Sequence, residues 1–362
     1  MKEDWKYSKL GDVCTIMMGQ SPSSDTYNDS VGLPFFQGNA DFGKVHPTVR
    51  VYCNSPIRIA DCGDILISVR APIGAINIAD RECCIGRGLS AIKNGKNVSN
   101  SFIYYALTAN KEKLIAQGTG STFKSIGRQA LNDLMLPIPS LYEQEGVVAE
   151  LDCLSGVIEK QKQQLKELDN LAQAIFYDMF GDPITNEKGW KNNTLKEVCA
   201  NLFAGGDVPK NNCSKEITEE YSIPILSNGV GENALYGYTN TARVKEVSIT
   251  ISGRGTIGYC EVRKIPFFPV VRLIVATPKQ HLILPIMLKY IIDAYQFKGT
   301  GGAIPQLTIP MIKDKSIILP PLSLQQEFAS KIEAIEKQKE LIKQSLSETE
   351  TLFNSRMDYY FN

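Results

Sequence analysis

Two stretches of the chain carry apolar residues at alternating spacings of four and three, which places them along one face of an α-helix. In the first stretch these positions are Val147, Leu151, Leu154, Ile158, Gln161, Leu165, Leu168, Ala172, Ile175 and Met179. In the second, displaced by 181 residues throughout, they are Phe328, Ile332, Ile335, Lys339, Ile342, Leu346, Thr349, Phe353, Arg356 and Tyr360. The pattern predicts two long helices in one heptad register.

Sequence signals mark the ends of these helices. The chain enters the first through Ser140-x-x-Glu143 and the second through Ser323-x-x-Gln326, and both stretches match a capping box. Gly181 follows the first stripe and predicts its end, because glycine readily adopts the left-handed conformation that closes a helix.

The two stripes predict helices that pair with each other. A heptad of about 35 residues makes a rod of roughly 50 Å, which is too long for one small domain to cover. The alternative is two separate amphipathic helices, each lying on its own domain. We expect the pairing and partner-binding positions to be Leu151, Leu154, Ile158, Leu165, Leu168, Ile175, Ile332, Ile335, Ile342, Leu346 and Phe353.

Short apolar runs bounded by turn residues occupy the rest of the chain and predict strands. Examples are CGDILISV at 62–69, INIAD at 76–80 and VSITISG at 247–253. One helix is predicted near the end of each such region, at 101–117 and at 284–297.

The chain repeats itself. ILISVRAPIGAI at 65–76 returns as ITISGRGTIGYC at 249–260, an offset of 184 residues, and LPIPSLYEQE returns as LPPLSLQQE. The offset drifts by a few residues elsewhere, as small loop insertions would cause. The sequence therefore predicts a duplicated domain.

Charge is divided between the predicted domains and helices. The 362 residues have a formal net charge of zero, but residues 1–140 carry +3 and 185–322 carry +5, whereas 141–184 carry −6 and 323–362 carry −2. A net charge of zero argues against nucleic acid as a partner. The separation of basic and acidic regions along the chain weakens that argument. Basic domains joined by acidic helices are what the sequence predicts.

The nine cysteines show no C-x-x-C spacing and indicate a reducing compartment. No uninterrupted apolar run reaches membrane-spanning length. We therefore expect a cytoplasmic protein.

Catalytic motifs are not evident. Two histidines supply a zinc site or a histidine-based triad poorly. GTGSTFKS at 118–125 has Phe123 where a phosphate loop needs glycine. The chain lacks Glu-x-Lys, the usual end of one nuclease motif, and its only Pro-Pro pair lies in LPPL rather than in a base-methylating tetrapeptide. We expect no metal, no cofactor and no catalytic residue in this chain.

Polar residues on the glycine-flanked turns are candidate DNA contacts. Arginine can bind phosphate or the O6 and N7 atoms of guanine, and glutamine or asparagine can bind the edge of adenine. For any single residue, a turn role or a surface ion pair is the alternative. The candidates are Arg70, Arg87, Arg254, Arg272, Gln37, Asn39 and Asn228.

Several segments together resemble the specificity subunit of type I restriction-modification enzymes. They are W-x5-G-D-V near the start, FFQGNAD, GDILISVRAPIG, the GTG segment, LPIPSLYEQE, FGDPITNEKGW and LPPLSLQQE. The resemblance covers essentially the whole chain. It implies an α+β fold with target recognition domains at 1–141 and 183–322, spacer helices at 142–182 and 323–362, and an antiparallel coiled coil with pseudo-two-fold symmetry.

The resemblance also implies a function. Each recognition domain would read one part of a split double-stranded DNA site, and the helices would bind two methyltransferase subunits, which restriction subunits join. S-adenosylmethionine and ATP would belong to those partners, and this chain would be non-catalytic. The halves differ in SVRAP against SGRGT and in STFKSIG against GAIPQLT, which predicts an asymmetric site and adds Lys124 and Gln306 to the candidates.

Two other functions remain open at this stage. The chain could be a self-contained DNA-modifying or restriction enzyme with an unrecognised site. It could also be a tether whose two domains bind protein.

Overall fold

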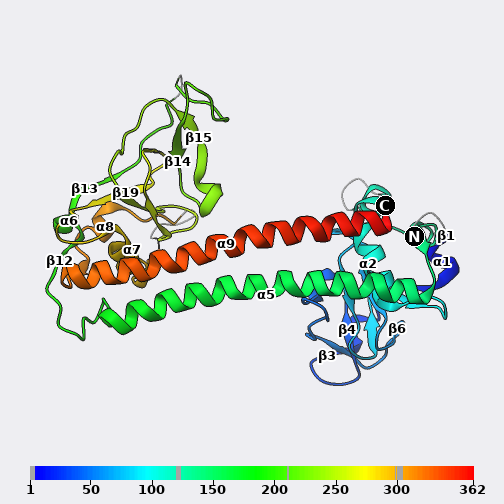
Figure 1. Ribbon diagram of the computed structural model, residues 1–362. Coiled ribbons are helices and arrows are strands. Elements are labelled where there is room, and N and C mark those ends of the chain that lie inside the picture. Colours follow the sequence, from blue (N-terminus) through cyan, green and yellow to red (C-terminus); the bar gives the residue numbers. More distant parts are fainter. Residues whose placement is uncertain (1–4, 120–123, 210–211, 298, 300–304) are drawn as a thin grey trace. The chain divides into compact units, whose positions relative to one another are not determined.

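The computed structural model describes residues 5–119, 124–209, 212–297, 299 and 305–362 (Figure 1). The chain forms two compact units. Unit 1 comprises residues 1–162 and 344–362, and unit 2 comprises residues 163–343. Two 40-residue helices, α5 (Leu141–Phe180) and α9 (Leu322–Phe361), each contribute residues to both units. The predicted α+β fold, with its duplicated β-rich part and two long helices, is confirmed.

The described residues of unit 1 form short strands and four short helices, in addition to parts of α5 and α9. Its strands are β1 (Lys6–Lys9), β2 (Cys14–Met18), β3 (Tyr27–Asn28), β4 (Leu33–Phe36), β5 (Tyr52–Cys53), β6 (Ile59–Ala60), β7 (Ile65–Ser68), β8 (Ile76–Ile78), β9 (Cys83–Ile85), β10 (Leu89–Asn94) and β11 (Met135–Ile138). Its helices are α1 (Leu10–Val13), α2 (Asn100–Ala109), α3 (Lys111–Ala116) and α4 (Arg128–Asn132), with 3-10 turns η2 (Ser24–Thr26) and η3 (Asn39–Asp41).

Unit 2 repeats this plan. Its strands are β12 (Asn192–Thr194), β13 (Cys199–Ala204), β14 (Ile223–Leu226), β15 (Leu235–Thr239), β16 (Ser248–Ile251), β17 (Cys260–Arg263), β18 (Phe268–Pro269), β19 (Ile274–Pro278) and β20 (Ser316–Ile318). Its helices are α6 (Leu195–Val198), α7 (Pro285–Ala294) and α8 (Ile309–Ile312), with a 3-10 turn η4 (Gly231–Ala234).

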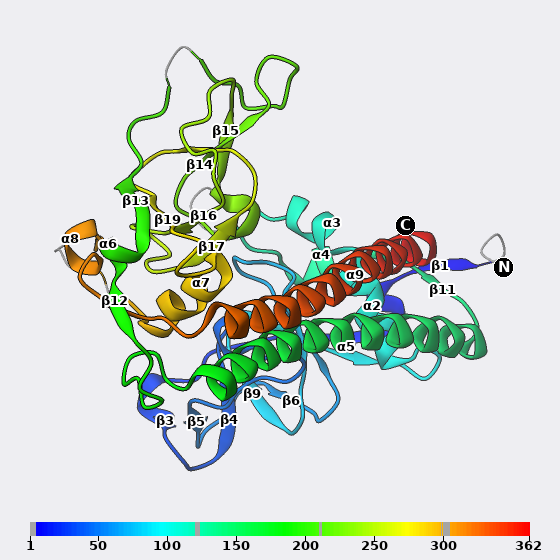
Figure 2. The same cartoon turned by 60° about the vertical axis from the view of Figure 1, so that its left-hand side comes forward.

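The sheets of the two units correspond. A four-stranded antiparallel sheet has the order β2-β10-β7-β8 in unit 1 and β13-β19-β16-β17 in unit 2. The second sheet of unit 1, β3-β5-β4-β9-β6, lies low in the view of Figure 2. Its parallel pair aligns Phe36 with Ile85, and the matching pair β14-β18 aligns Leu226 with Pro269.

Each core joins the four-stranded sheet, the adjacent short helix and one end of each long helix. In unit 1, Ile67 and Ile92 of the sheet share a cluster with Phe102 of α2, Leu151 of α5 and Phe361 of α9. The early turns of α5 thus meet the late turns of α9, so the helices run antiparallel within this unit. In unit 2, the late turns of α5 and the early turns of α9 meet in the same sense.

The seam between the long helices contains polar residues as well as apolar ones. Every predicted heptad position is buried or half-buried. In unit 1, Gln161 Nε2 donates to Ser345 Oγ at 2.9 Å. In unit 2, Lys339 pairs with Asp169 at 2.7 Å and with Glu336 at 2.8 Å. Lys339 is the least exposed member of these pairs, at 14%, whereas Asp169 and Glu336 are largely exposed. Because each pair is formed in one alignment only, the pairs favour a single register of the two helices.

In each unit, one glutamine at the start of a long helix forms hydrogen bonds to the loop that precedes a short helix, α2 in unit 1 and α7 in unit 2. Gln144 Nε2 donates to the carbonyls of Asn97 and Pro139, and its Oε1 accepts the N–H of Ser99. Its counterpart Gln325 makes the same three bonds, to Leu282, Pro320 and Leu284. Both glutamine side chains are fully buried.

Three sequence expectations about helix ends have different outcomes. The capping box of Ser140 and Glu143 is present, and α5 ends at Phe180 before Gly181, whose φ is +73°. The capping box predicted at Ser323 and Gln326 is wrong. The helix α9 begins at Leu322, so Ser323 lies inside its first turn rather than before it. The side chain that holds this end of α9 is Gln325 instead.

The predicted helix at 101–117 is also wrong as a single element. The structure has α2 and α3, separated at Asn110. The Asn110 side chain donates back to the carbonyl of Ala106 at 2.9 Å. Asn110 has φ −94° and ψ +13°, outside the helical region, so the two helices change direction at this residue.

Among the described residues, no helix is long and apolar enough to cross a membrane.

Candidate nucleic-acid interface

A cavity of about 340 Å³ lies in unit 1 where three strands end. The chain segments that follow β4, β7 and β9 bring four of the predicted residues to its wall. Among the described residues, neither an aspartate nor a glutamate lines it. The lining residues are Ser21, Gln37, Gly38, Asn39, Ser68, Arg70, Ala71, Arg87 and Gly88. Two cations and two amides therefore converge on one concave, positively charged surface.

Backbone hydrogen bonds fix the wall of this cavity. Gly86 donates to the carbonyl of Phe36 at 2.8 Å, and Val69 donates to that of Gly88 at 2.9 Å. A Cβ at position 88 would lie 2.3 Å from the Gln37 carbonyl oxygen. The chain can pass this close to Gln37 only with glycine at position 88. The frame is thus set by backbone atoms, and Gln37 and Arg87, both exposed, line the cavity that it forms.

Arg70 and Lys124 lie on adjacent chain segments in unit 1. The backbone of Arg70 bridges that of Ser125, and both Arg70 and Lys124 are exposed. Lys124 is not among the residues that line the cavity. In the part of the chain that the structure describes, neither cation has an acidic partner within ion-pair distance.

In unit 2, Asn228 ties together the loops that carry the candidate arginines. Its Oδ1 accepts the N–H of Gly253 at 2.7 Å and of Arg254 at 3.4 Å, and its Nδ2 donates to the carbonyl of Val271 at 2.7 Å. The Asn228 amide, which the sequence suggests for reading adenine, is thus engaged with the backbone.

Arg254 and Gln306 contact each other directly. Arg254 Nη2 donates to Gln306 Oε1 at 3.1 Å. The segments that carry them are held side by side by the N–H of Leu307, which donates to the carbonyl of Gly253 at 2.8 Å. Unit 2 thus brings three predicted residues together: Asn228, Arg254 and Gln306.

Arg272 lies on a strained turn. Val271 and Arg272 have φ values of +52° and +61°, which side chains other than glycine seldom adopt. Their N–H groups donate to the carbonyls of Gly206 and Gly205 and hold the turn in place. Strain of this kind concentrates at functional sites, and the exposed Arg272 side chain projects from this turn.

One pair of corresponding positions shows how the two units differ in their loops. Two residues beyond the parallel strand pair, unit 1 has Gly38 and unit 2 has Asn228. Gly38 has no side chain and lines the cavity. Asn228 extends its amide to the neighbouring loops instead. The same frame is therefore open in unit 1 and bridged in unit 2.

Sequence reasoning missed a second cavity, of about 330 Å³, in unit 2. It is lined by Asn201, Phe203, Arg243, Val244, Lys245, Glu246 and Thr277. The Arg243 guanidinium lies 4.6 Å from the centre of the Phe203 ring. The basic pair in the segment ARVKE was the one available signal, and it falls outside the conspicuous repeats.

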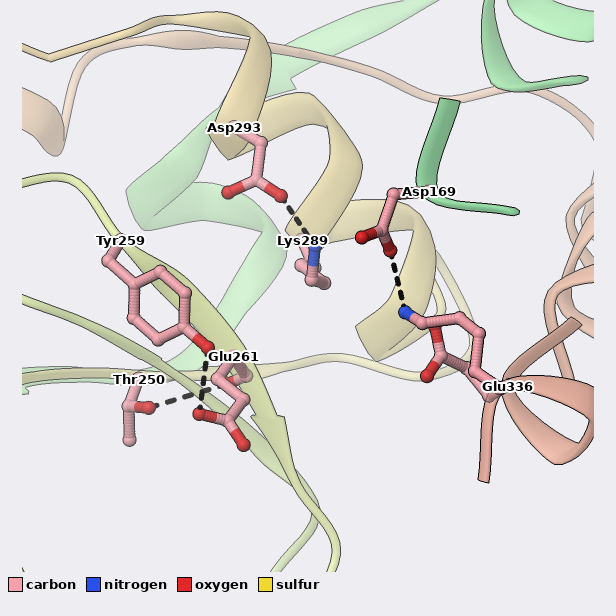
Figure 3. Close-up of polar contacts among 8 residues, drawn as sticks. Asp169, Thr250, Tyr259, Glu261, Lys289, Asp293 and Glu336 are labelled. Atoms are coloured by element: carbon pink, nitrogen blue, oxygen red, sulfur yellow. Dashed lines mark hydrogen bonds and ion pairs between the residues drawn. The ribbon is translucent and has the colours of Figure 1, made fainter. Parts of the chain in front are cut away.

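Unit 2 also has a polar cluster around α7, which Figure 3 shows. Lys289 and Asp293 pair at 2.6 Å within the helix, while the Tyr259 hydroxyl donates to Glu261 on β17 at 3.3 Å. Burial raises the pKa of Asp293. Burial by itself would lower the pKa of Lys289, but the Asp293 carboxylate more than offsets this and raises it. Arg263 holds Glu261 at 2.8 Å.

These charges are paired with one another, so we interpret the α7 cluster as structural rather than catalytic. Within the described ranges, no three histidine, cysteine, aspartate or glutamate side chains are grouped so that they could hold a metal ion.

Known proteins resemble this chain in sequence and in fold. A family model described as "Type I restriction modification DNA specificity domain" matches residues 2–170 and 187–351. The putative type I restriction enzyme MjaX specificity subunit of Methanocaldococcus jannaschii is 40% identical over 177 residues, which are 48% of this chain and 42% of that protein. The match thus spans less than half of that relative's length.

Two further relatives match over most of the chain. The type I restriction enzyme MjaIX specificity subunit of the same organism is 25% identical over 92% of this chain and 87% of its own. A crystal structure of the type I restriction-modification system S subunit from M. genitalium shares the fold, with a TM-score of 0.62 and 16% identity over 99% of this chain and 96% of that one. Because the family model covers most of its length in two copies, the chain belongs to the type I restriction-modification DNA specificity family.

Proposed function

We propose that the chain is the non-catalytic DNA-recognition subunit of a type I restriction-modification complex, and that its two units read the two parts of an asymmetric, bipartite site in double-stranded DNA. The observation that carries the proposal is the unit 1 cavity, where Gln37, Asn39, Arg70 and Arg87 converge and no acidic side chain of the described chain is present. Family membership supports the same conclusion.

The chemistry of these side chains suits base edges and phosphates. An arginine can donate two hydrogen bonds to O6 and N7 of guanine, and a glutamine or asparagine can exchange two with adenine. Cations that lack a carboxylate partner in the described chain retain their full attraction for phosphate. Both kinds of contact are available at one surface of unit 1.

An asymmetric site is supported by the difference between the units. Gly38 leaves a cavity in unit 1, whereas Asn228 bridges the corresponding loops in unit 2. Because the walls differ in shape and in hydrogen-bonding groups, the two units would select different base sequences.

The long helices would fix the gap between the two parts of the site and bind two methyltransferase subunits. Leu171 on α5 and Leu352 on α9 occupy matching positions 181 residues apart, and their exposed fractions are 48% and 47%. Matching apolar side chains suit two copies of one partner. Restriction subunits would join this assembly, and S-adenosylmethionine and ATP would be bound by the partners rather than by this chain.

DNA binding by the complex with methyltransferase subunits tests the proposal. We expect sequence-dependent affinity that falls steeply as salt rises, and a marked loss in the double variant Arg70→Ala, Arg87→Ala. Arg81→Ala is the matched control, because Arg81 is an exposed arginine of the same unit that pairs with Asp80.

Two results would contradict the proposal. Methyl transfer by the isolated chain would indicate a self-contained enzyme. A complex with no DNA affinity at any salt concentration would indicate a protein-binding tether.

A further inference from the structure

We propose that Arg254 and Gln306 form a guanine-reading pair in unit 2, in which Gln306 both positions the arginine and donates to the base. The inference rests on the proposed function, since it names the base that one part of the DNA site must contain. It goes further in assigning a joint specificity to two residues that lie 52 positions apart in the sequence.

The contact has only one chemically possible arrangement. Arg254 Nη2 lies 3.1 Å from the Gln306 side chain, and a guanidinium is a donor only. The atom that faces Arg254 must therefore be the amide oxygen of Gln306. Its amide nitrogen, with two N–H groups, is then directed away from the arginine.

Hydrogen bonds fix the backbone around Arg254, but its charged guanidinium group has no acidic partner among the described residues. Asn228 accepts the N–H groups of Gly253 and Arg254, and Leu307 donates to Gly253 on the other side. In the described residues no carboxylate lies within ion-pair distance of Arg254, and its Nε is buried without a hydrogen-bond partner. The buried Nε is closed to a ligand, so the donors that remain are the Nη N–H groups of Arg254 that Gln306 does not use.

The pair directs donors away from itself, because Gln306 Oε1 faces Arg254 and accepts from it, whereas the Gln306 amide N–H groups and the remaining Arg254 N–H groups are donors. In the major groove guanine offers two adjacent acceptors, O6 and N7, whereas adenine offers N7 beside a donating amino group, and cytosine presents a donor. An array of donors therefore fits guanine and opposes the amino groups of adenine and cytosine.

Unit 1 lacks this pair. The position that corresponds to Gln306 is Ser125, as the matching bonds of Ile126 to Val69 and of Leu307 to Gly253 establish. Serine is too short to repeat the contact, and Arg70 is exposed where Arg254 is half-buried. The guanine preference should therefore affect only the part of the DNA site that unit 2 reads.

The test is methylation-sensitive sequencing of DNA modified by the complex of this chain with its methyltransferase subunit. We compare the wild type with Gln306→Ser, Gln306→Glu and Arg254→Lys. Gln280→Ser is the control, because Gln280 is an exposed glutamine of the same unit. At one position in one half of the site, we expect Gln306→Ser to lower the preference of the complex for guanine over adenine about tenfold. The base preferences in the other half should stay unchanged.

The Gln306→Glu variant distinguishes a base-contacting role of Gln306 from a purely structural one. Glutamate can still accept from Arg254, so a purely structural role would survive the substitution. A reading role would not, because the two amide donors become a negatively charged acceptor, and the guanine preference should disappear. Thermal unfolding of each variant shows whether the fold is kept, and Arg254→Lys tests the pair without changing Gln306 or the net charge.

The possible failures are distinguishable. If the wild-type complex methylates no defined sequence, the proposed function fails. If it methylates a defined bipartite site but Gln306→Glu and Arg254→Lys keep every base preference, the function stands and the guanine-reading pair is refuted.

Discussion

Asn228 holds the backbone of Gly253 through a hydrogen bond of 2.7 Å to its Oδ1, and the same side chain reaches Val271 from its Nδ2. Two loops that are remote in sequence are thereby joined by one amide. Removal of a partner from such bonds leaves polar backbone groups unsatisfied, which typically costs about 1–3 kcal/mol for each buried group.

Asn228→Ala should therefore destabilise unit 2 and weaken DNA binding together. We expect a lower midpoint of thermal unfolding and a lower affinity of the assembled complex. Asn39→Ala is the control for stability, since Asn39 lines the unit 1 cavity and its side chain makes no hydrogen bond within the described residues. Equal midpoints for the two variants would mean that the Asn228 bridge is not required for the fold.

Gly88→Ala should deform the unit 1 cavity. The added Cβ would lie 2.3 Å from the Gln37 carbonyl oxygen, so one of the two loops must move. We expect reduced affinity for DNA and altered base preference in one half of the site only. Gly127→Ala is the matched control, because its Cβ would meet no atom within 4 Å. Unchanged binding by Gly88→Ala would show that the cavity wall does not position reading groups.

The α5 capping box should make stability depend on pH in the acid range. Hydrogen bonds from the Ser140 hydroxyl, then from the Ser140 N–H and from Trp5, lower the pKa of Glu143 below its ordinary 4.5. A carboxyl group with a lowered folded pKa contributes its stability above the unfolded pKa, and that stability is lost as the pH falls through the folded value.

Denaturant unfolding between neutral and acid pH checks this prediction. The difference in unfolding free energy between wild type and Glu143→Gln should be present near pH 7 and should shrink below about pH 4.5. The exposed neighbour Glu145 supplies the control, Glu145→Gln. A difference that stays constant with pH would argue against the capping role.

Four residues inserted after Leu168 should rotate the following heptad positions relative to the preceding ones. The apolar stripe on α5 would then no longer run continuously along one face. We expect a lower affinity for the bipartite site or a different required gap, measured with duplexes of varied spacing. An equal insertion after Glu219, in an exposed loop, is the control. Unchanged gap and affinity would mean that the helices do not set the spacing.

The helices could be predicted from the sequence because a heptad stripe is a local, repeated signal. Phe176, Phe180, Met357 and Phe361 fall outside that stripe, yet they are buried in the unit cores. They face the short helix and sheet rather than only the opposite long helix. A seam pattern alone cannot reveal a second buried face that depends on where another element packs.

The candidate interface was predictable as a set of residue types but not as an arrangement. Gln37 and Arg87 were identified singly, and their convergence depends on the parallel pairing of β4 with β9. The contact of Arg254 with Gln306 depends on a hydrogen bond between two loops. Asn228 looked like a base-reading residue because its amide chemistry suits adenine and a backbone clamp equally well.

The clamps of Gln144 and Gln325 consist of amides and backbone groups, with no charged atom. Screening by ions weakens interactions between charges and leaves neutral hydrogen bonds largely unaffected. If the proposed function holds, concentrated salt should release DNA from this protein while the hydrogen bonds of Gln144 and Gln325 remain formed. Purification in high salt would yield a folded, nucleic-acid-free protein that regains its ligand on dilution.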